Sequence, residues 1–447
     1  MNLTNSFTKL HIKQKIVMKI QPIIRNACIG LALVVMNTSI VESKPRLFNA
    51  QRPPHNHAPS LPPLPSGRFG DTLPGLTDSQ AADFAVGKEE FENVETPEGG
   101  LGPVFNNKSC ATCHTDPVIG GASAQFVTRF GRTENNNFDA LETEGGSLLQ
   151  QNAISRAAKE EVPTATWCQA HPQLATCTVA NVIVKRITTP LFGLGLIEAI
   201  PDETIRANAT QSKPDGVRGH VSIVMDATRE PKIVERVGRF GWKAQQATLL
   251  AFAGDAYLNE MGITNRLFPN ENAPNGNIEL LAEFDTVIDP EDTVDTLTGK
   301  GDIDTAADFM RYLGAPPRIK LSNSATAGKE IFNQTGCAAC HMPSMQTGFS
   351  PVAALNRKTV SLYSDLLVHD MGKLGDGIKQ GNADIREMRT APLWGLSARP
   401  VYLHDGRTKS IDASIRAHDG EAKTSQIKYT KLTPQSIQQI LDFLNSL

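Results

Sequence analysis

Two short motifs in the chain bring together the residue types that can attach a metal-containing cofactor. Each has two cysteines separated by two residues and followed directly by a histidine: Cys110-Ala-Thr-Cys113-His114 and Cys337-Ala-Ala-Cys340-His341. Thiols one helical turn apart can both add to the vinyl groups of one haem, and the adjacent histidine then becomes an axial ligand of the iron. The sequence therefore predicts two covalently bound haem c groups, with His114 and His341 as iron ligands.

Neither chance nor zinc binding accounts for both motifs as well as haem does. A single motif of this kind arises by chance or serves as a redox-active thiol pair, but here each copy follows a Gly-Lys-Glu segment, at Gly87 and at Gly328. A zinc site would need a second thiol pair or a histidine cluster at zinc-finger spacing, and neither motif has one. Haem attachment is the interpretation that both motifs support.

Residues 1–43 have the pattern of a secretory signal peptide. Five basic residues lead into the apolar run Ala27–Met36, which is too short to span a bilayer. A buried N-terminal helix is the alternative, but proline-rich chain follows the run instead of a packed element. Cleavage near Ser43 would leave a periplasmic protein without a membrane span, and the loss of five basic residues and Glu42 would change the formal charge from −3 to −7. A mildly acidic protein is not expected to bind nucleic acid.

The cysteines outside the two motifs are consistent with export. Cys28 lies within the signal segment, and Cys168 and Cys177 bound a small loop. Exported thiols meet an oxidising compartment, which favours a disulfide between these two over a pair of free thiols.

The rest of the chain has an extended segment and a loose internal repeat. Residues 44–75 are rich in proline and predict a tether. Beyond them, Thr189-Pro-Leu-Phe-Gly resembles Thr390-Ala-Pro-Leu-Trp-Gly, and each repeat closes on an amphipathic helix, at 304–313 and from Thr433-Pro434 onward. These features predict a mainly α fold with two cytochrome c-like haem domains, 76–315 and 316–447. The first domain is the more elaborated, because it holds the cysteine loop and a further stretch around 200–300.

Several segments together resemble a known family. The runs 389–396, 403–407 and 411–415 are similar to the closing segment of bacterial di-haem cytochrome c peroxidases and MauG-like proteins. The segments 191–201, 238–245, His369-Asp-Met-Gly372 and 418–422 more closely resemble di-haem oxidoreductases of the peroxidase type, often labelled thiol oxidoreductases. The resemblance extends from about Leu76 to the C-terminus.

The resemblance implies a ligand set for the second haem. In the peroxidases, the sixth ligand of the electron-donating haem is a methionine fourteen residues after the histidine of a His-Asp-Gly motif, and His418 stands at that distance from His404. Ligation by His341 and His418 would lower the reduction potential relative to a histidine–methionine pair. His418 as a structural residue, with Met371 as the ligand, remains an alternative. His404 is interpreted as a hydrogen-bonding residue near this haem.

The first haem departs from the peroxidase pattern. The histidine that closes this iron in the peroxidases is expected about sixteen residues after His114, where this chain has Phe130. An open iron can bind peroxide, whose cleavage needs an acid or base. Glu198 is the candidate for that role, with His220 a weaker one. Trp242 is the candidate aromatic for electron transfer between the haems, as in the relatives.

Three functions are compatible with these residues. The first is a periplasmic peroxidase that reduces hydrogen peroxide, or another small oxidant, at the first haem, with electrons delivered through the second haem by a small redox protein such as a cytochrome c. The second is a purely electron-transferring di-haem cytochrome. The third is an oxidase of a protein or thiol partner.

Overall fold

The computed structural model describes residues 67–172, 176–228, 232–288 and 293–447, and the described chain belongs to one compact unit. The predicted signal peptide and most of the predicted tether lie outside the described residues. The end of that tether is described, and it packs on the folded part. Phe69 contacts Phe192 with ring centres 5.1 Å apart, and the Leu73 N–H donates to the carbonyl of Tyr312. The packed structure therefore begins before Leu76.

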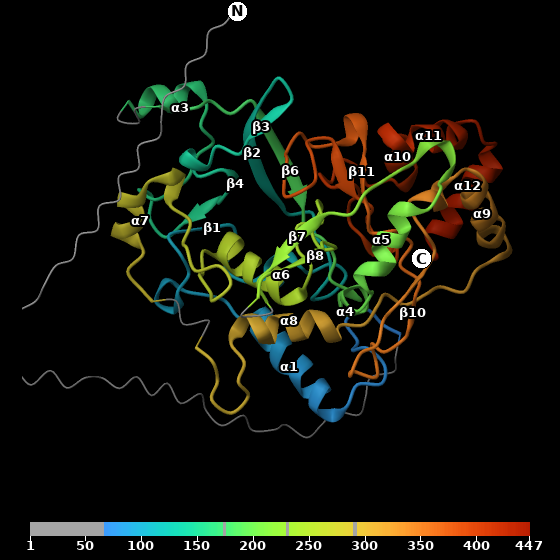
Figure 1. Cartoon of the computed structure of the whole chain (residues 1–447), viewed down its shortest axis with the longest axis horizontal. Helices are drawn as coiled ribbons and strands as arrows, with labels where there is room; N and C mark the ends of the chain where they lie inside the picture. The colour runs from blue at the N-terminus through green and yellow to red at the C-terminus, as the bar shows by residue number, and fades with distance from the viewer. Residues whose placement is uncertain (1–66, 173–175, 229–231, 289–292) are drawn as a thin grey trace, which may run out of the picture. The chain divides into compact units, whose positions relative to one another are not determined.

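The first CxxCH motif follows one helix of a crossed pair. Helix α1 (Asp78–Glu92) begins with a capping box at Thr77 and crosses α8 (Asp302–Tyr312), as Figure 1 shows. The crossing is close because Gly87 has no side chain: a Cβ there would lie 2.2 Å from the carbonyl oxygen of Thr305. Next to the crossing, the rings of Phe91 and Phe309 are 4.7 Å apart. Glycine thus lets the two backbones meet, and the phenylalanines fill the space beside them.

The second CxxCH motif follows an equivalent pair. Helix α9 (Asn323–Gln334) crosses α12 (Pro434–Leu444) at Gly328, where a Cβ would lie 1.9 Å from the carbonyl oxygen of Gln439. Phe332 and Phe443 repeat the aromatic contact at 5.4 Å. Thr433 caps α12, as the sequence predicts, by accepting from the Ser436 N–H. The sequence repeat around Gly87 and Gly328 is therefore also a structural repeat.

The insertion in the first repeat forms a sheet. Strand β2 (Phe126–Glu134) pairs antiparallel with β3 (Asn137–Asp139), β4 (Ser147–Leu149) and β6 (Val182–Ile187). The described chain is 35% helix and 15% strand. Helix is the larger share, as the predicted mainly α class requires, but the fold is not all helical. The sequence did not reveal this sheet because its longest strand, β2, lacks regular alternation of buried and exposed residues.

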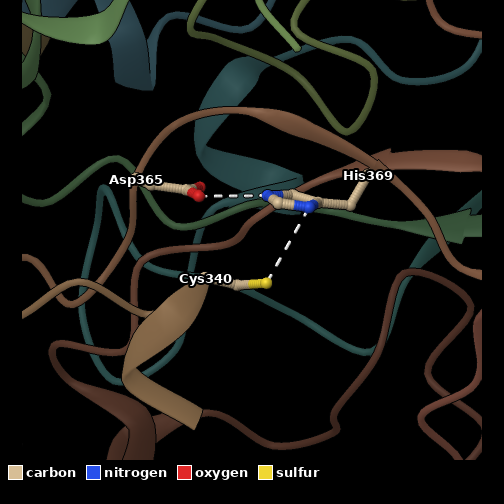
Figure 2. A group of neighbouring side chains, drawn as sticks. All are labelled: Cys340, Asp365 and His369. Carbon is tan, nitrogen blue, oxygen red and sulfur yellow. Dashed lines mark hydrogen bonds and ion pairs between the residues drawn. The ribbon is translucent and has the colours of Figure 1, made fainter. Parts of the chain in front are cut away.

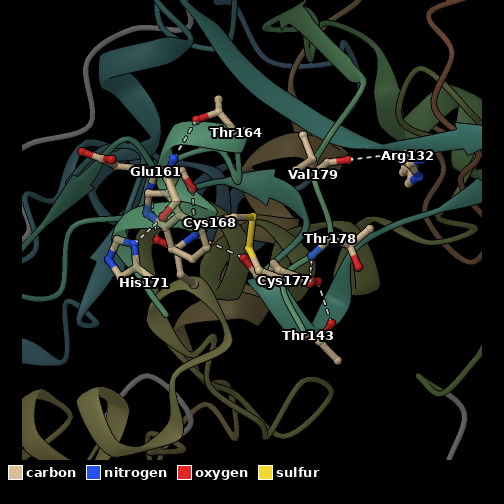
Figure 3. The surroundings of a disulfide bond; sticks show 12 residues. Arg132, Thr143, Glu161, Thr164, Cys168, His171, Cys177, Thr178 and Val179 are labelled. Carbon is tan, nitrogen blue, oxygen red and sulfur yellow. Dashed lines mark hydrogen bonds between the residues drawn. A yellow bond between two sulfur atoms is a disulfide. The ribbon is translucent and has the colours of Figure 1, made fainter. Parts of the chain in front are cut away.

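A disulfide joins Cys168 to Cys177, as the sequence predicts. Cys168 lies in the short helix α3 (Ala165–Ala170), which Thr164 caps by accepting from the Trp167 N–H (Figure 3). After Cys177, the Thr178 N–H donates to Glu144 and the Val179 carbonyl accepts from Arg132 of β2. The disulfide therefore ties α3 to the chain that returns to the sheet.

Shorter elements complete the fold. The larger hydrophobic core contains α1, α6 and α8 residues together with Leu366 and Trp394 of the second repeat, and a smaller core joins α9 and α12. The predicted boundary between a first domain that ends at residue 315 and a second that begins at 316 does not coincide with the separation of the two cores, and this boundary stays a prediction.

No helix in the described ranges is both long and apolar enough to cross a membrane. Apart from further short 3-10 turns, the other elements are β1 (Val104–Phe105), α2 (Cys110–Cys113), β5 (Asn152–Ala153), α4 (Leu194–Glu198), α5 (Asp202–Thr210), β7 (Ile223–Asp226), β8 (Val234–Val237), α6 (Leu249–Ala256), the π-helical turn η4 (Tyr257–Met261), α7 (Ile278–Phe284), the 3-10 turn η6 (Cys337–Ala339), β9 (Met345–Gln346), β10 (Thr359–Val360), β11 (Val368–Asp370), β12 (Glu387–Arg389), α10 (Ile411–Arg416) and α11 (Lys423–Thr430).

Candidate active site

The first motif presents a histidine that is prepared to bind a metal. The single turn α2 ends at His114, whose Nδ1 lies 3.0 Å from the carbonyl oxygen of Gly121. A carbonyl only accepts, so Nδ1 carries the proton and Nε2 keeps its lone pair for a metal. Burial lowers the pKa of His114 to about 4, which keeps the ring neutral near pH 7. Neutral imidazole is the form that ligates iron.

A large cavity opens beside this motif. Cys110, Cys113 and His114 form part of its wall. Other walls come from β2, α6, the π-helical turn η4 and α8. Within the described ranges, His114 is the only histidine on this wall. Phe130, at the position where the peroxidases carry a second histidine, is buried in β2 and does not line the cavity.

Several polar side chains face the first cavity. Burial raises the pKa of Asp255 and of Glu260 above the usual carboxyl range. Asp255 accepts a hydrogen bond from Asn259 Nδ2 at 3.1 Å, and the positive charge of Arg129 partly offsets the rise in its pKa. Gln245 adds a buried Oε1 with no hydrogen-bond partner. A mainly apolar cavity with a few converging polar groups is the usual form of a reaction site.

The second motif presents two histidines. His341 Nδ1 lies 3.1 Å from the Tyr363 carbonyl, and His418 Nδ1 lies 2.8 Å from the Ser414 carbonyl, so both Nε2 atoms remain available to a metal. The ring centres of His341 and His418 are 6.5 Å apart. Metal–nitrogen bonds of about 2 Å on each side of one iron place two ring centres about 6 Å apart. The two imidazoles are therefore spaced as the axial ligands of a single metal would be.

The cavity between these histidines is as large as the first one. Its wall includes Cys337, Cys340, His341 and His418. Met371, the alternative ligand, also lines it. His404 lines it too, and burial lowers its pKa to about 4. The structure therefore gathers every residue that the sequence assigns to the second haem around one cavity.

Buried arginines give an independent test of whether haem fits these cavities. Arg129 faces the first cavity, and Arg389 and Arg399 face the second. Burial lowers the pKa of all three to about 10. Their hydrogen bonds run to Ser147 or to backbone carbonyls, Arg399 Nε has no partner, and no ion pair is found for any of them within the described ranges. Haem carries two propionate groups, so guanidinium groups without a carboxylate suit it, and the cavities fit the cofactor.

Trp242 lies on the walls of both cavities. Its indole N–H donates to the carbonyl of Ile187 in β6 at 2.9 Å, and its backbone carbonyl accepts from the Arg389 N–H in β12. Its ring is edge-on to His404, with centres 6.3 Å apart. Of the sequence-predicted residues, Trp242 is the one that the structure places between the two motifs.

Glu198 lies outside both cavities. One of its carboxylate oxygens accepts from the Leu249 N–H at 2.7 Å, and the other pairs with Arg311 Nε at 2.9 Å. The first contact satisfies the first backbone N–H of α6, and the second joins α4 to α8. His220 is also outside the cavities, paired with Glu387. The geometry thus gives both residues structural partners and does not bring either to the first motif.

Sequence reasoning missed the polar residues of the first cavity. Asp255 is the only charged residue in the run Leu249–Leu258, and an isolated carboxylate in an apolar helix is a recognisable sign of a functional position. Arg129 has no such sign, because it sits in a strand without regular alternation. Its place on the cavity wall follows only from how β2 packs.

A third group of side chains touches the second motif. Cys340, Asp365 and His369 have ligand atoms within 4.8 Å of one another (Figure 2). Cys340 belongs to the CxxCH motif, where its sulfur is expected to carry the haem. The group is therefore interpreted as part of the surroundings of the second haem and not as a separate metal site.

Comparison with known proteins identifies the family. Residues 175–447, more than half of the chain, match the family described as "Di-haem oxidoreductase, putative peroxidase". The chain belongs to this di-haem oxidoreductase family. The matched residues include the second CxxCH motif and begin after the first. No curated protein matches the chain.

Solved structures with a likeness to the chain are distant. Hydrazine synthase of Kuenenia stuttgartiensis is 14% identical, with 94% of this chain and 100% of that chain covered and a TM-score of 0.36. The dihaem peroxidase BthA of Burkholderia thailandensis is 13% identical, with 87% and 94% covered and a TM-score of 0.37. A MauG-like protein associated with microbial copper homeostasis is 18% identical, with 57% and 89% covered and a TM-score of 0.30.

Proposed function

We propose that this oxidoreductase is an exported, periplasmic c-type protein that reduces hydrogen peroxide at its first haem. Electrons from a small redox protein such as a cytochrome c enter through the second haem, and both haems are attached covalently through the CxxCH cysteines. The observation that carries the proposal is the difference between the cavities. The second cavity has His341 and His418 with ring centres 6.5 Å apart, whereas the described wall of the first has one histidine, together with two carboxyl groups of raised pKa.

The haem irons supply the redox chemistry: a closed iron stores and passes electrons, and an open one binds a small oxidant. Overall, one peroxide takes up two electrons and two protons and yields two waters. His114 would hold the iron of the first haem, and His341 with His418 would hold that of the second. Trp242 contributes an aromatic ring between the two cavities.

The proton transfer is assigned to Asp255. Its raised pKa suits a group that exchanges protons with a bound substrate. Asp255 therefore takes the role that the sequence suggested for Glu198.

The function is tested with the haem-loaded protein, reduced cytochrome c and hydrogen peroxide. We expect peroxide-dependent oxidation of the cytochrome, and a high-spin EPR signal from the first iron. No oxidation under any state of pre-reduction would exclude the peroxidase. Loss of the high-spin signal as well would instead favour a pure electron carrier with both irons closed by protein ligands.

The assignment of Asp255 is tested by two single variants. D255N is expected to lower kcat/KM for peroxide by about 10²-fold to 10⁴-fold, the usual contribution of a general acid–base group. E198Q is expected to lower thermal stability and to leave the chemical step unchanged, because Glu198 holds the start of α6 outside the cavity. An equal loss of kcat/KM in E198Q would restore the sequence-based assignment.

A further inference from the structure

His369 lies between two carboxylates beside the second haem motif. Its side chain is 2% exposed and lines the second cavity. Nε2 is 3.0 Å from an oxygen of Asp365, and Nδ1 is 2.9 Å from an oxygen of Glu421. Figure 2 shows the ring between the Asp365 carboxylate and the Cys340 sulfur, which lies 3.8 Å from Nδ1. The family resemblance pointed to the segment of His369, but the proposed reaction does not use this residue.

On one side, the ring is connected to the motif that carries His341. Asp365 is fully buried, and its backbone N–H donates to the carbonyl of Cys340 at 2.9 Å. Its carboxylate also pairs with Lys213, whose side chain is 7% exposed. Asp365 is therefore fixed to the residue that precedes His341.

On the other side, the ring is connected to the segment that begins with His418. Glu421, three residues further on, accepts from the backbone N–H groups of Arg218 (2.8 Å) and Gly219 (3.1 Å) as well as from His369. The two segments are also in close backbone contact, since a Cβ at Gly420 would lie 2.2 Å from the carbonyl oxygen of Asp370. The loop that carries His418 is thus docked on the segment that carries His369.

The hydrogen bonds require a charged ring. Carboxylates only accept, so His369 satisfies Asp365 and Glu421 together only when both of its nitrogens are protonated. The hydrogen bonds to Asp365 and Glu421 oppose the effect of burial and raise the pKa of His369. If the His369 ring were neutral, it could donate to only one of the two carboxylates, Asp365 or Glu421. The other carboxylate would then lose a hydrogen-bond donor and the nearby positive charge.

We propose that His369 is a positioning residue for the second haem: as a bridge between Asp365 and Glu421 it sets the separation of His341 and His418. The inference rests on the proposed ligation of the second iron by these two histidines. His341 and His418 belong to segments far apart in the chain. The bridge connects these two segments through the side chains of Asp365, His369 and Glu421. Loss of the bridge should loosen His418 on the iron and leave the haem attached.

The test measures carbon monoxide binding and EPR of the haem-loaded, full-length protein. Carbon monoxide binds reduced haem only where a position is open, so binding at the second haem reports how firmly His418 is held. The main variant is E421Q, because this side chain is 21% exposed and glutamine keeps its size. We expect carbon monoxide to bind the second haem about 10-fold to 100-fold more tightly in E421Q, in line with the effect of outer residues on metal ligands, with part of the low-spin EPR signal lost. H369N should show the same change.

Two comparisons separate this inference from the proposed function. H418A removes the ligand itself and should convert the second haem to high spin; no change in H418A would refute the ligation on which this inference rests, whereas the proposed function fails only if peroxide does not oxidise reduced cytochrome c. If H418A does change the spectrum while E421Q keeps wild-type carbon monoxide affinity and EPR, the positioning role of His369 is refuted. The matched control is H220Q, which breaks another histidine–glutamate pair, His220 with Glu387 at 3.0 Å, outside both cavities. H220Q should leave both readouts unchanged, and an equal effect would show that E421Q acts through general loosening.

Discussion

The ring centres of His341 and His418 lie 6.5 Å apart, and each Nδ1 is held on a backbone carbonyl. Both rings are therefore oriented before any metal binds. In the first cavity, His114 is held in the same way on Gly121 but has no second histidine on the described wall. The two CxxCH motifs are alike in sequence, but their surroundings differ: two histidines can bind one metal at the second motif, and one histidine can do so on the described wall of the first.

Replacing His418 by methionine should raise the reduction potential of the second haem, because a thioether favours the reduced iron more than imidazole does. H418M is checked by a redox titration followed in the visible spectrum. M371L is its control: Met371 lines the same cavity, and its loss should leave the potential unchanged if His418 is the ligand. A shifted potential in M371L with an unshifted one in H418M would assign the ligand to Met371.

Trp242 should affect electron transfer between the haems without affecting their ligands. In W242F the hydrogen bond to Ile187 is lost and a smaller ring remains between the cavities. We expect slower re-oxidation of the second haem by peroxide in stopped-flow measurements, with unchanged EPR. W167F is the matched control, because Trp167 is buried beside the disulfide and lines neither cavity. Equal rates in W242F and wild type would remove Trp242 from the pathway.

Gly328 should be intolerant of a side chain. G328A places a Cβ 1.9 Å from the Gln439 carbonyl oxygen, so α9 and α12 must separate. We expect a loss of about 1–3 kcal/mol or more in the free energy of unfolding, as for other overpacked contacts. Chemical denaturation measures it. In G99A the nearest atoms are 3.5 Å away, and this variant should unfold like the wild type.

Glu160 should make stability depend on pH. It accepts from the N–H groups of Gln150 (2.7 Å) and Asn275 (3.1 Å), and burial raises its pKa from 4.5 to about 7. The folded chain therefore keeps a proton that the unfolded chain releases, so this contribution is full below about pH 4.5 and is lost as the pH rises through 7. The wild type should lose up to about 3 kcal/mol more than E160Q over this range. Denaturation curves at several pH values decide it, and E161Q, at the exposed neighbouring position, should behave like the wild type.

The disulfide should stabilise the insertion and not the haem sites. Serine at both Cys168 and Cys177 removes a cross-link over a short loop, which is expected to cost about 2–3 kcal/mol of unfolding free energy. Calorimetry measures the loss. The haem spectra should not change, because neither cysteine lines a cavity. An altered spectrum at the first haem would show that the loop supports that site.

Chemistry that depends on local spacing could be predicted from the sequence alone. Two thiols and a histidine must be close in the chain to attach one haem, so both CxxCH motifs were visible, as were the capped helix α12 and the pairing of Cys168 with Cys177. The repeat around Gly87 and Gly328 was visible because each glycine serves a helix crossing, which few other residues allow. The place of His418 opposite His341 needed the family resemblance, since the two lie far apart in the chain.

Only the tertiary structure decided which side chains share the first cavity with His114. Asp255, Gln245 and Arg129 come from separate elements that meet through packing, and no spacing rule relates them. Glu198 follows a conspicuous motif, yet its oxygens are taken by the start of α6 and by Arg311. The position of Trp242 on both cavity walls also depends on the tertiary structure, because hydrogen bonds to β6 and β12 hold it there. Sequence determined where the haems are expected to attach, and packing decided what surrounds them, because a cavity wall is assembled from residues that are distant in the chain.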